Sequence, residues 1–180
     1  MPTFDPSNAS LHVFTFKEGL LSRAGHDLKL AAERFHVEVR EDGRVVVEVD
    51  PASLRVLAAQ KGGRDDLAAL SRRDQRQIGE NLRDDVLETS RYPLIRFTSH
   101  VDERRGDRLP GTLLLHGVER PVELELVEEP DHLVASVTLH QPDFGITPYT
   151  ALLGAIRVKP DVRVVVELPS AEGLTAHTRS

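Results

Sequence analysis

The sequence lacks several features that would assign it to a class at once. Its 180 residues include no cysteine and no tryptophan, and aromatic residues account for only 4%. The absence of cysteine excludes disulfide bonds and thiol catalysis. No stretch approaches the roughly 20 consecutive apolar residues that a membrane-spanning helix requires, so we expect no membrane span.

Signals for export and for nucleic-acid binding are also missing. The N-terminus contains neither a basic segment nor an apolar segment of the kind found in secretion signals. The formal net charge is −6, and acidic residues interrupt every long run of Lys and Arg, whereas binding to nucleic-acid phosphates needs a concentrated positive patch. We therefore expect a cytoplasmic protein that does not bind nucleic acid.

What the sequence does contain is alternation of apolar and polar residues over most of its length, which is typical of β-strands with one buried face. In its central part the turns are short, as at residues 117–121, where Gly reverses the chain and Pro restarts it. Such short connections allow only antiparallel neighbours. The apolar positions of the central strands are Ile95, Phe97, Leu113, Leu115, Val122 and Leu124.

The whole chain has about eight such segments, which predicts an all-β fold in a single domain. An antiparallel sheet of this size forms a sandwich or curls into a barrel, and a barrel of about eight strands encloses either packed side chains or one small ligand. We predict that the barrel domain spans residues 1–168. Residues 169–180 are polar and rich in small side chains, which predicts a flexible tail.

Residues 51–90 interrupt the alternation and predict a helical insertion. Ser71 and Asp74 have the spacing of a capping box, and Ile78, Leu82 and Val86 recur every four residues, as on one face of a helix. These signals predict a helix over 72–88. Residues 60–64 are expected to form an exposed loop, followed by a short helical turn around 67.

Four motifs in this order resemble the YceI-like family, over roughly residues 4–168. They are the segment 87–93 ending in Tyr92-Pro93, the strand Phe97-Thr98-Ser99, the Gly-Thr-Leu-Leu-Leu-His-Gly-Val-Glu-Arg-Pro-Val hairpin at 111–122, and Asp143-Phe144-Gly145-Ile146. The resemblance implies a lipocalin-like antiparallel barrel with a helical lid. It also implies binding of a polyisoprenoid or another long amphiphile in an apolar cavity, and mildly supports a homodimer.

If the barrel has a cavity, its wall should consist of the apolar faces of the strands and the insertion. The predicted ligand-binding residues are Phe14, Phe16, Leu82, Val86, Ile95, Phe97, Leu113, Leu115, Val122, Leu124, Phe144 and Ile146. The same side chains could instead pack a closed core, which would leave an interaction module without a ligand. Donors for a charged head group at the mouth are available from Arg91, Arg96, Arg120, Arg157 and Lys159.

Histidines provide the main alternative. His26 beside Asp27 could form a metal-assisted or acid–base site, with His100, His116 or His140 brought close by the fold. No two histidines have the short spacing of a helical metal motif, and there is no Gly-x-Ser-x-Gly elbow. The prediction is therefore a binding protein rather than an enzyme, with no metal and no cofactor.

Overall fold

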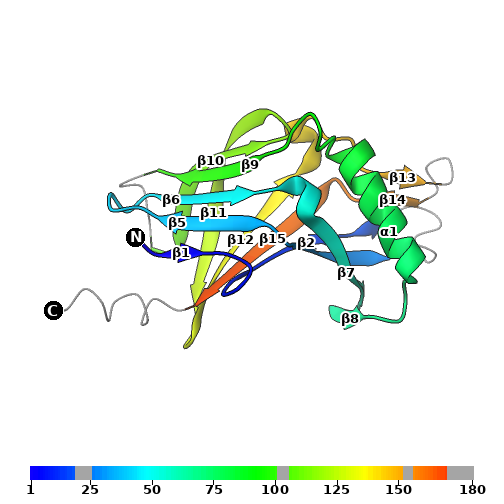
Figure 1. Ribbon diagram of the computed structural model, residues 1–180, viewed down its shortest axis with the longest axis horizontal. Helices are drawn as coiled ribbons and strands as arrows, with labels where there is room; N and C mark the ends of the chain where they lie inside the picture. Colours follow the sequence, from blue (N-terminus) through cyan, green and yellow to red (C-terminus); the bar gives the residue numbers. More distant parts are fainter. Residues whose placement is uncertain (19–25, 101–105, 152–155, 170–180) are drawn as a thin grey trace.

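The computed structural model describes residues 1–18, 26–100, 106–151 and 156–169. Within them, twelve strands form one antiparallel sheet in the order β1-β5-β6-β9-β10-β11-β12-β15-β2-β4-β7-β8, and three short strands form a second sheet in the order β13-β14-β3. The large sheet curls round on itself, with the helix α1 (Arg72–Asn81) at one end (Figure 1). The all-β, lipocalin-like class is confirmed, but the predicted number of strands was too low.

The strands are β1 (Thr3–Phe4), β2 (Ser10–Thr15), β3 (Lys17–Glu18), β4 (Asp27–Ala32), β5 (Phe35–Val39), β6 (Val45–Val49), β7 (Leu54–Lys61), β8 (Arg64–Asp66), β9 (Ile95–Ser99), β10 (Arg108–Leu115), β11 (Val118–Glu128), β12 (His132–His140), β13 (Thr150–Ala151), β14 (Ile156–Val158) and β15 (Asp161–Pro169). The helical segments are η2 (Pro51–Ser53), α1 (Arg72–Asn81), η3 (Leu82–Val86) and η4 (Gln141–Phe144).

A bend in one long hairpin brings the two ends of the large sheet together. Strand β4 continues into β5, and β6 returns through η2 into β7, so each arm of the hairpin changes direction at the same level. There the Arg34 backbone N–H donates to the Ser53 hydroxyl (3.0 Å), and the Asp50 N–H donates to the Arg34 carbonyl (3.1 Å). These bonds connect the two arms across the corner, where the regular ladder is interrupted.

The inward face of the sheet forms the core. Along β10 the residues alternate between buried and half-buried, and Leu109, Gly111, Leu113 and Leu115 are the buried ones. Their neighbours across the ladder continue the same face, because Leu113 pairs with Phe97 of β9 and Gly111 with Val122 of β11. The period of two in the sequence therefore predicted correctly which face of these central strands is buried.

The helical insertion predicted for residues 51–90 was wrong in its first part, and the exposed loop predicted at 60–64 is reduced to a tight turn. Residues 54–61 form strand β7, which pairs with β4, and Gly62 and Gly63 turn the chain tightly into β8 with φ of 59° and 76°. Two consecutive residues at positive φ suit the two-residue hairpin turns that match strand twist. The strand was missed because its alternation is interrupted. The register shifts between Lys29 and Leu30 of β4, which leaves Leu57 of β7 as an extra residue. Beyond it, neighbouring Ala58 and Ala59 are both buried.

The predicted capping box is present at the start of α1. The Asp74 backbone N–H donates to the Ser71 hydroxyl (3.2 Å), and the Ser71 N–H donates to the Asp74 carboxylate (3.1 Å). The hydrogen bonds from the Ser71 side chain and backbone hold the pKa of Asp74 below its ordinary value. The α-helix ends at Asn81, earlier than predicted, and continues as the π-helical turn η3.

Two further findings concern the expected tail and membrane span. Apart from Pro169, the predicted tail lies outside the described residues. No helix in the described ranges combines the length and the apolar character that crossing a membrane requires.

Gly111 allows a close contact inside the sheet and provides a test of the packing. A Cβ at this position would overlap the Cε2 and Cζ atoms of Phe97 and lie 2.6 Å from the Thr98 carbonyl oxygen. We expect Gly111→Ala to lower the free energy of unfolding by about 3 kcal/mol in urea denaturation, because the backbone oxygen cannot move away.

Gly79 of α1 is the matched control, because a Cβ there meets nothing within 4 Å. Gly79→Ala should leave stability unchanged or raise it by up to about 1 kcal/mol through helix propensity. Equal effects of the two substitutions would contradict the close packing of Phe97 on Gly111.

Candidate functional site

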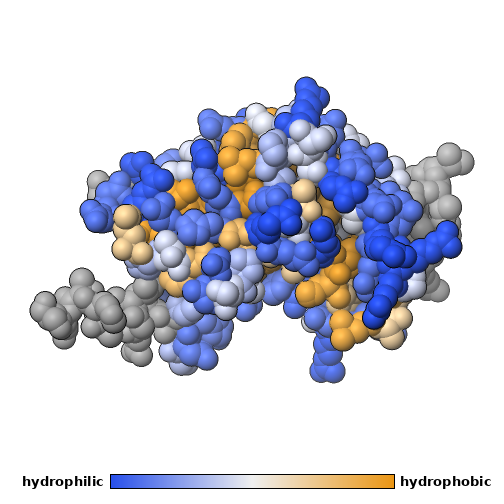
Figure 2. Space-filling view, in the orientation of Figure 1, coloured by the Kyte–Doolittle hydropathy of each residue, from blue (hydrophilic) through white to orange (hydrophobic). Residues whose placement is uncertain are grey.

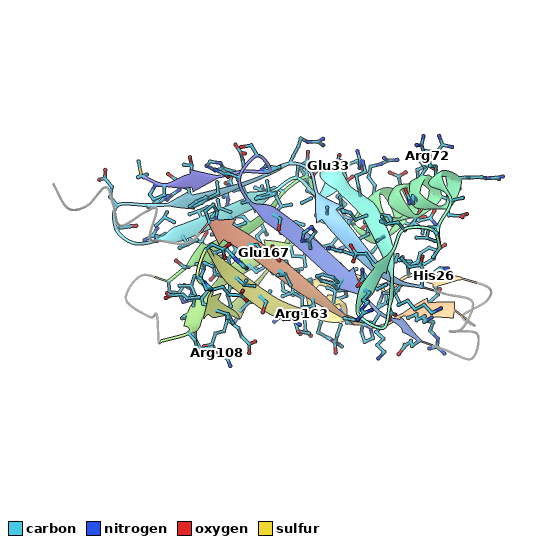
Figure 3. All side chains as sticks on the ribbon, turned by 90° about the horizontal axis from the view of Figure 1, so that it is seen from below. His26, Glu33, Arg72, Arg108, Arg163 and Glu167 are labelled. Carbon is cyan, nitrogen blue, oxygen red and sulfur yellow. The ribbon has the colours of Figure 1, made fainter. Side chains whose placement is uncertain are left out.

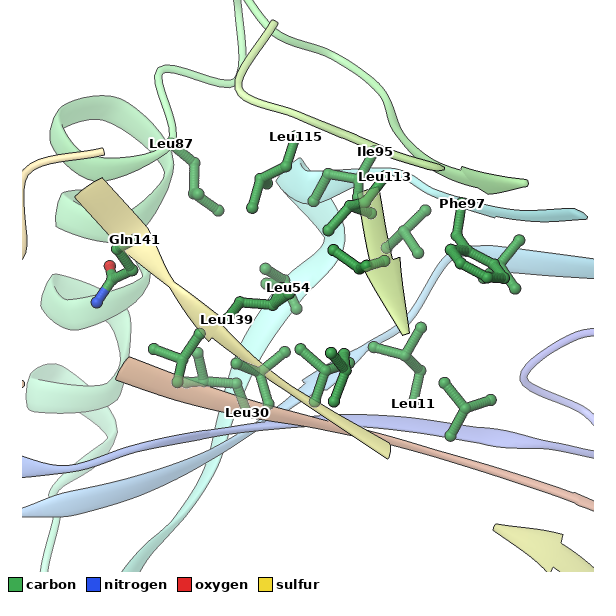
Figure 4. A pocket seen from close by; sticks show the side chains of 18 of the residues that line it. Leu11, Leu30, Leu54, Leu87, Ile95, Phe97, Leu113, Leu115, Leu139 and Gln141 are labelled. Atoms are coloured by element: carbon green, nitrogen blue, oxygen red, sulfur yellow. The ribbon is translucent and has the colours of Figure 1, made fainter. Parts of the chain in front are cut away.

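A cavity of about 160 Å³ lies inside the curled sheet. Its lining residues come from strands on all sides of the barrel and from the helical end (Figure 4). The side chains extend from Leu87 and Gln141 beside the helix to Phe97 and Leu11 at the other end of the cavity (Figure 4). The cavity is therefore an elongated space along the barrel rather than a surface dimple.

The chemistry of this lining is almost purely hydrocarbon. Apart from Phe97, its apolar members are Leu, Val, Ile and Ala, and its polar members are Thr15, Ser136 and Gln141. None of the described lining residues is ionisable. The cavity therefore offers burial and dispersion contacts to an uncharged group, whereas a charged group placed there would lose its hydration without gaining an opposite charge.

At the helical end of the cavity, hydrogen bonds from its amide nitrogen hold the Gln141 side chain in place. Nε2 donates to the carbonyl oxygens of Lys159 (3.0 Å) and Pro160 (3.3 Å), and the residue is only 8% exposed. These bonds hold the start of η4 against the segment that precedes β15. The amide thus closes a corner of the barrel wall without bringing a charge into the cavity.

Thr15 is different, because its buried hydroxyl oxygen has no hydrogen-bond partner within the described residues. It follows Leu11 and Val13 on the inward face of β2, and all three line the cavity. A buried hydroxyl without a partner lowers stability, since it has given up hydrogen bonds to water.

The helical end of the cavity is held by a group of side chains centred on His116, which we call the His116 clasp. His116 Nε2 lies 3.1 Å from the Glu88 carboxylate, and Nδ1 lies 3.2 Å from the Phe144 carbonyl oxygen. The Tyr92 ring packs on the imidazole with 4.1 Å between centroids. The clasp therefore ties the segment after η3 to the β10–β11 turn and to η4.

The backbone of the clasp is strained at two positions. Glu88 and His116 have φ of 44° and 52°, in the left-handed region that residues other than glycine enter at a cost. Gly117 follows with φ of 74°, and a Cβ there would lie 2.7 Å from Cε1 of Tyr92. The Tyr92, His116-Gly117 and Phe144 positions of the sequence motifs thus meet at one point.

The structure brings nine of the twelve predicted ligand-binding residues to the cavity lining. They are Leu82, Val86, Ile95, Phe97, Leu113, Leu115, Val122, Leu124 and Ile146. Leu82 and Val86 come from η3, and the next six come from the central strands β9, β10 and β11. These residues form one continuous apolar surface.

Phe14, Phe16 and Phe144 do not belong to the lining, which differs from the expectation. Leu11, Val13 and Thr15 occupy the inward positions of β2, so Phe14 projects outward, where the Lys29 ammonium lies 6.0 Å from its ring centroid. Phe16 is 37% exposed. Phe144 is 2% exposed and packs in the core of the wall.

Several lining residues were not predicted, mainly from β2, β6, β12 and β15. In β2 both parities are apolar, so alternation alone does not say which face is inside. In β15 the alternation of Val162, Val164 and Val166 with Asp161 and Arg163 gives a usable signal. The other lining residues that were not predicted are Leu11, Val13, Thr15, Leu30, Val47, Val49, Leu54, Leu87, Ala135, Ser136, Val137, Leu139 and Gln141.

The candidate histidines are engaged separately. His100 Nε2 lies 3.1 Å from the Thr112 hydroxyl, and His140 Nδ1 lies 2.6 Å from the Asp161 carboxylate. His26 is exposed, and the Asp27 carboxylate accepts a hydrogen bond from the Lys17 backbone N–H (2.7 Å). In the described part of the chain, no three His, Asp or Glu side chains are grouped so as to hold a metal ion.

The candidate head-group donors lie away from the cavity lining. Arg96 pairs with Glu48 (2.8 Å), the Arg91 guanidinium lies 5.0 Å from the Tyr92 ring centroid, and Arg120 donates to the Asp143 carbonyl (3.2 Å). Arg157 and Lys159 are exposed. Their positions do not support contact with a group inside the cavity.

Comparison with known proteins gives a family and a fold. The sequence matches the YceI-like domain over residues 3–169. No functionally curated protein is detectably similar in sequence.

Solved structures with the same fold have low sequence identity. Burkholderia cenocepacia BcnA has a TM-score of 0.58 and 13% identity, over 90% of this chain and 96% of that one. A polyisoprenoid binding domain from Saccharophagus degradans has a TM-score of 0.57 and 14% identity, over 90% and 94%. The Campylobacter jejuni YceI protein has a TM-score of 0.51 and 16% identity, over 79% and 85%.

Thr15 provides a test of how the cavity wall is built. Thr15→Val keeps the shape of the side chain and removes the buried hydroxyl that has no partner. We expect the free energy of unfolding to rise by about 1 kcal/mol in urea denaturation. The control Thr138→Val changes an exposed hydroxyl on β12 and should alter stability by less than about 0.5 kcal/mol. A loss of stability in Thr15→Val would show that the hydroxyl has a partner.

Proposed function

Because this chain belongs to the YceI-like family and its barrel encloses an apolar cavity, we propose that it binds a long apolar or amphiphilic molecule of the polyisoprenoid or fatty-chain type. The hydrocarbon chain lies in the barrel, and the protein sequesters or carries it. The observation that carries this proposal is the cavity lining without an ionisable residue. The polyisoprenoid binding domain from S. degradans, which shares the fold, supports it by analogy.

Burial of hydrocarbon supplies enough free energy for such binding. Each methylene group removed from water contributes about 0.8 kcal/mol, so a chain with about ten buried methylene groups gains about 8 kcal/mol before the cost of association. The gain needs no directional bond. An aliphatic wall therefore selects for the length and shape of the chain, with little discrimination between apolar ligands of similar size.

The cavity volume also says something about how a long ligand enters. At about 160 Å³, the cavity is close in size to an engineered cavity of about 150 Å³ that accepts benzene. Pockets for larger ligands have volumes of about 300–1,000 Å³. A long chain must therefore widen the barrel, and we infer that binding is accompanied by repacking of the Leu and Val side chains of the wall.

A pair of adjacent leucines on β10 tests the proposal. Leu113 lines the cavity and is 7% exposed, whereas Leu114 lies on the opposite face of the strand. We expect Leu113→Arg to weaken binding of geranylgeraniol, measured by displacement of cis-parinaric acid, by at least about tenfold, because the guanidinium would be desolvated in the cavity. Leu114→Arg should bind as the wild type does.

Leu113→Arg also destabilises the fold, so a milder variant is needed beside it. Val137→Phe adds volume to the cavity lining without a charge and should weaken binding while the thermal unfolding transition remains cooperative. Wild-type affinity in a folded Val137→Phe variant and in Leu113→Arg would contradict the proposed location of the ligand.

A further inference from the structure

A second cavity lies between α1 and β7 and differs from the first in its charge. It has a volume of about 490 Å³ and is lined by Arg55 and Val56 of β7 and by residues of α1 and η3. Four of its lining residues are arginines, and one is an acid, Glu80. The surface over α1 is strongly hydrophilic (Figure 2). We call this cavity the arginine cleft.

The helix supplies three of the four arginines from one face. Arg72, Arg76 and Arg83 are spaced so that they follow one another along the same side of the helical segment, with Gly79 between them. Arg72 projects from α1 near its start (Figure 3). A Cβ at Gly79 would meet nothing within 4 Å, so this position leaves the floor of the cleft open between the charged side chains.

Two of the arginines have acidic partners and two do not. Arg55 lies 3.5 Å from the Glu33 carboxylate, and Arg83 lies 3.0 Å from the Asp84 carboxylate. Neither Arg72 nor Arg76 has an ion pair within the described ranges 1–18, 26–100, 106–151 and 156–169. In a chain with a net charge of −6, this concentration of positive charge is a local exception.

The arginine cleft and the apolar cavity adjoin each other across β7 and η3. Leu54 lines the cavity, whereas Val56, two residues further along the same face of β7, lines the cleft. On the helical side, Leu82 lines the cavity and the next residue, Arg83, lines the cleft. The apolar and the basic sites are therefore neighbours in the sequence and in space.

The boundary between the two sites is a seam held by side chains. The outer edge of β7 pairs with β8 only from residue 59 onward. Over residues 54–58, no backbone hydrogen bond joins β7 to α1 or η3 in the described chain. Separation of the two sides of this seam would break no ladder of backbone hydrogen bonds, which makes it the place where a ligand that occupies both sites would cross the wall.

We propose that the arginine cleft binds the phosphate or diphosphate head group of the amphiphile whose chain lies in the apolar cavity. This inference rests on the proposed function, because it takes the hydrocarbon chain of the ligand to lie in the apolar cavity. Guanidinium groups bind phosphate oxygens through paired, charge-assisted hydrogen bonds. Several arginines around one space match the charge of a diphosphate better than that of a single carboxylate, and binding also relieves the repulsion among the arginines.

The test compares three probes on the whole protein: geranylgeranyl diphosphate, geranylgeraniol and inorganic diphosphate, by isothermal titration calorimetry at low salt. The wild type should bind the prenyl diphosphate at least about tenfold more tightly than the alcohol. Arg72→Gln with Arg76→Gln should abolish this difference and leave the affinity for geranylgeraniol unchanged. The preference should also decrease as salt is added.

Arg64→Gln with Arg73→Gln is the matched control, because it removes the same charge from residues outside the cleft lining. It should retain the preference for the diphosphate. A second pair of variants leaves all arginines in place: Gly79→Glu should reduce the preference by placing a carboxylate in the cleft, and Gly79→Gln should reduce it less.

The results separate the head-group site from the apolar site. Equal affinity of the wild type for the two prenyl probes, or a preference that survives in Arg72→Gln with Arg76→Gln, would overturn the head-group site while leaving the apolar site intact. Inorganic diphosphate that binds only when Arg72 and Arg76 are present would support the anion site by itself. If that happened and neither prenyl probe bound, the proposed function would fail and the anion site would stand.

Discussion

The structure depends on the exclusion of charge from the inward face of one curled antiparallel sheet. Apart from the bulge in β7, the strands around the cavity place alternate residues inside, and a charged residue at any of these positions would have to be desolvated without a partner. The cavity lining accordingly consists of aliphatic side chains with one phenylalanine and a few uncharged polar residues. The absence of charge on the inward face lets the sheet curl around its interior. It also makes that interior suitable for a hydrocarbon chain.

At the helical end of the barrel, one short helical segment contributes residues to two different sites. Leu82 and Val86 of η3 complete the apolar cavity, while Arg72, Arg76 and Arg83 line the outer cleft. The His116 clasp fixes the chain just after η3, through contacts to Glu88 and Phe144. Among the described residues, no backbone hydrogen bond joins α1 or η3 to residues 54–58 of β7, so this part of the wall lacks a backbone ladder.

Sequence reasoning succeeded where one strong local signal decided the structure. The alternation of Ile95 with Phe97 and of Leu113 with Leu115 identified the buried face, and Ser71 with Asp74 identified the start of the helix. It failed where tertiary context decided. In β2, where both faces are apolar, the neighbouring strands determined that Phe14 lies outside. The arginine cleft depends on the approach of α1 to β7, which the sequence does not reveal.

The central claim is that the barrel holds a hydrocarbon chain, and the most direct measurement is denaturing organic extraction of the purified protein followed by mass spectrometry. The account predicts a prenyl or acyl species in near-stoichiometric amount, either from the purified protein directly or after incubation with geranylgeraniol and removal of the excess. An extract without any such species in both experiments would contradict it, because an apolar cavity that takes up no chain under saturating conditions would be part of a packed core.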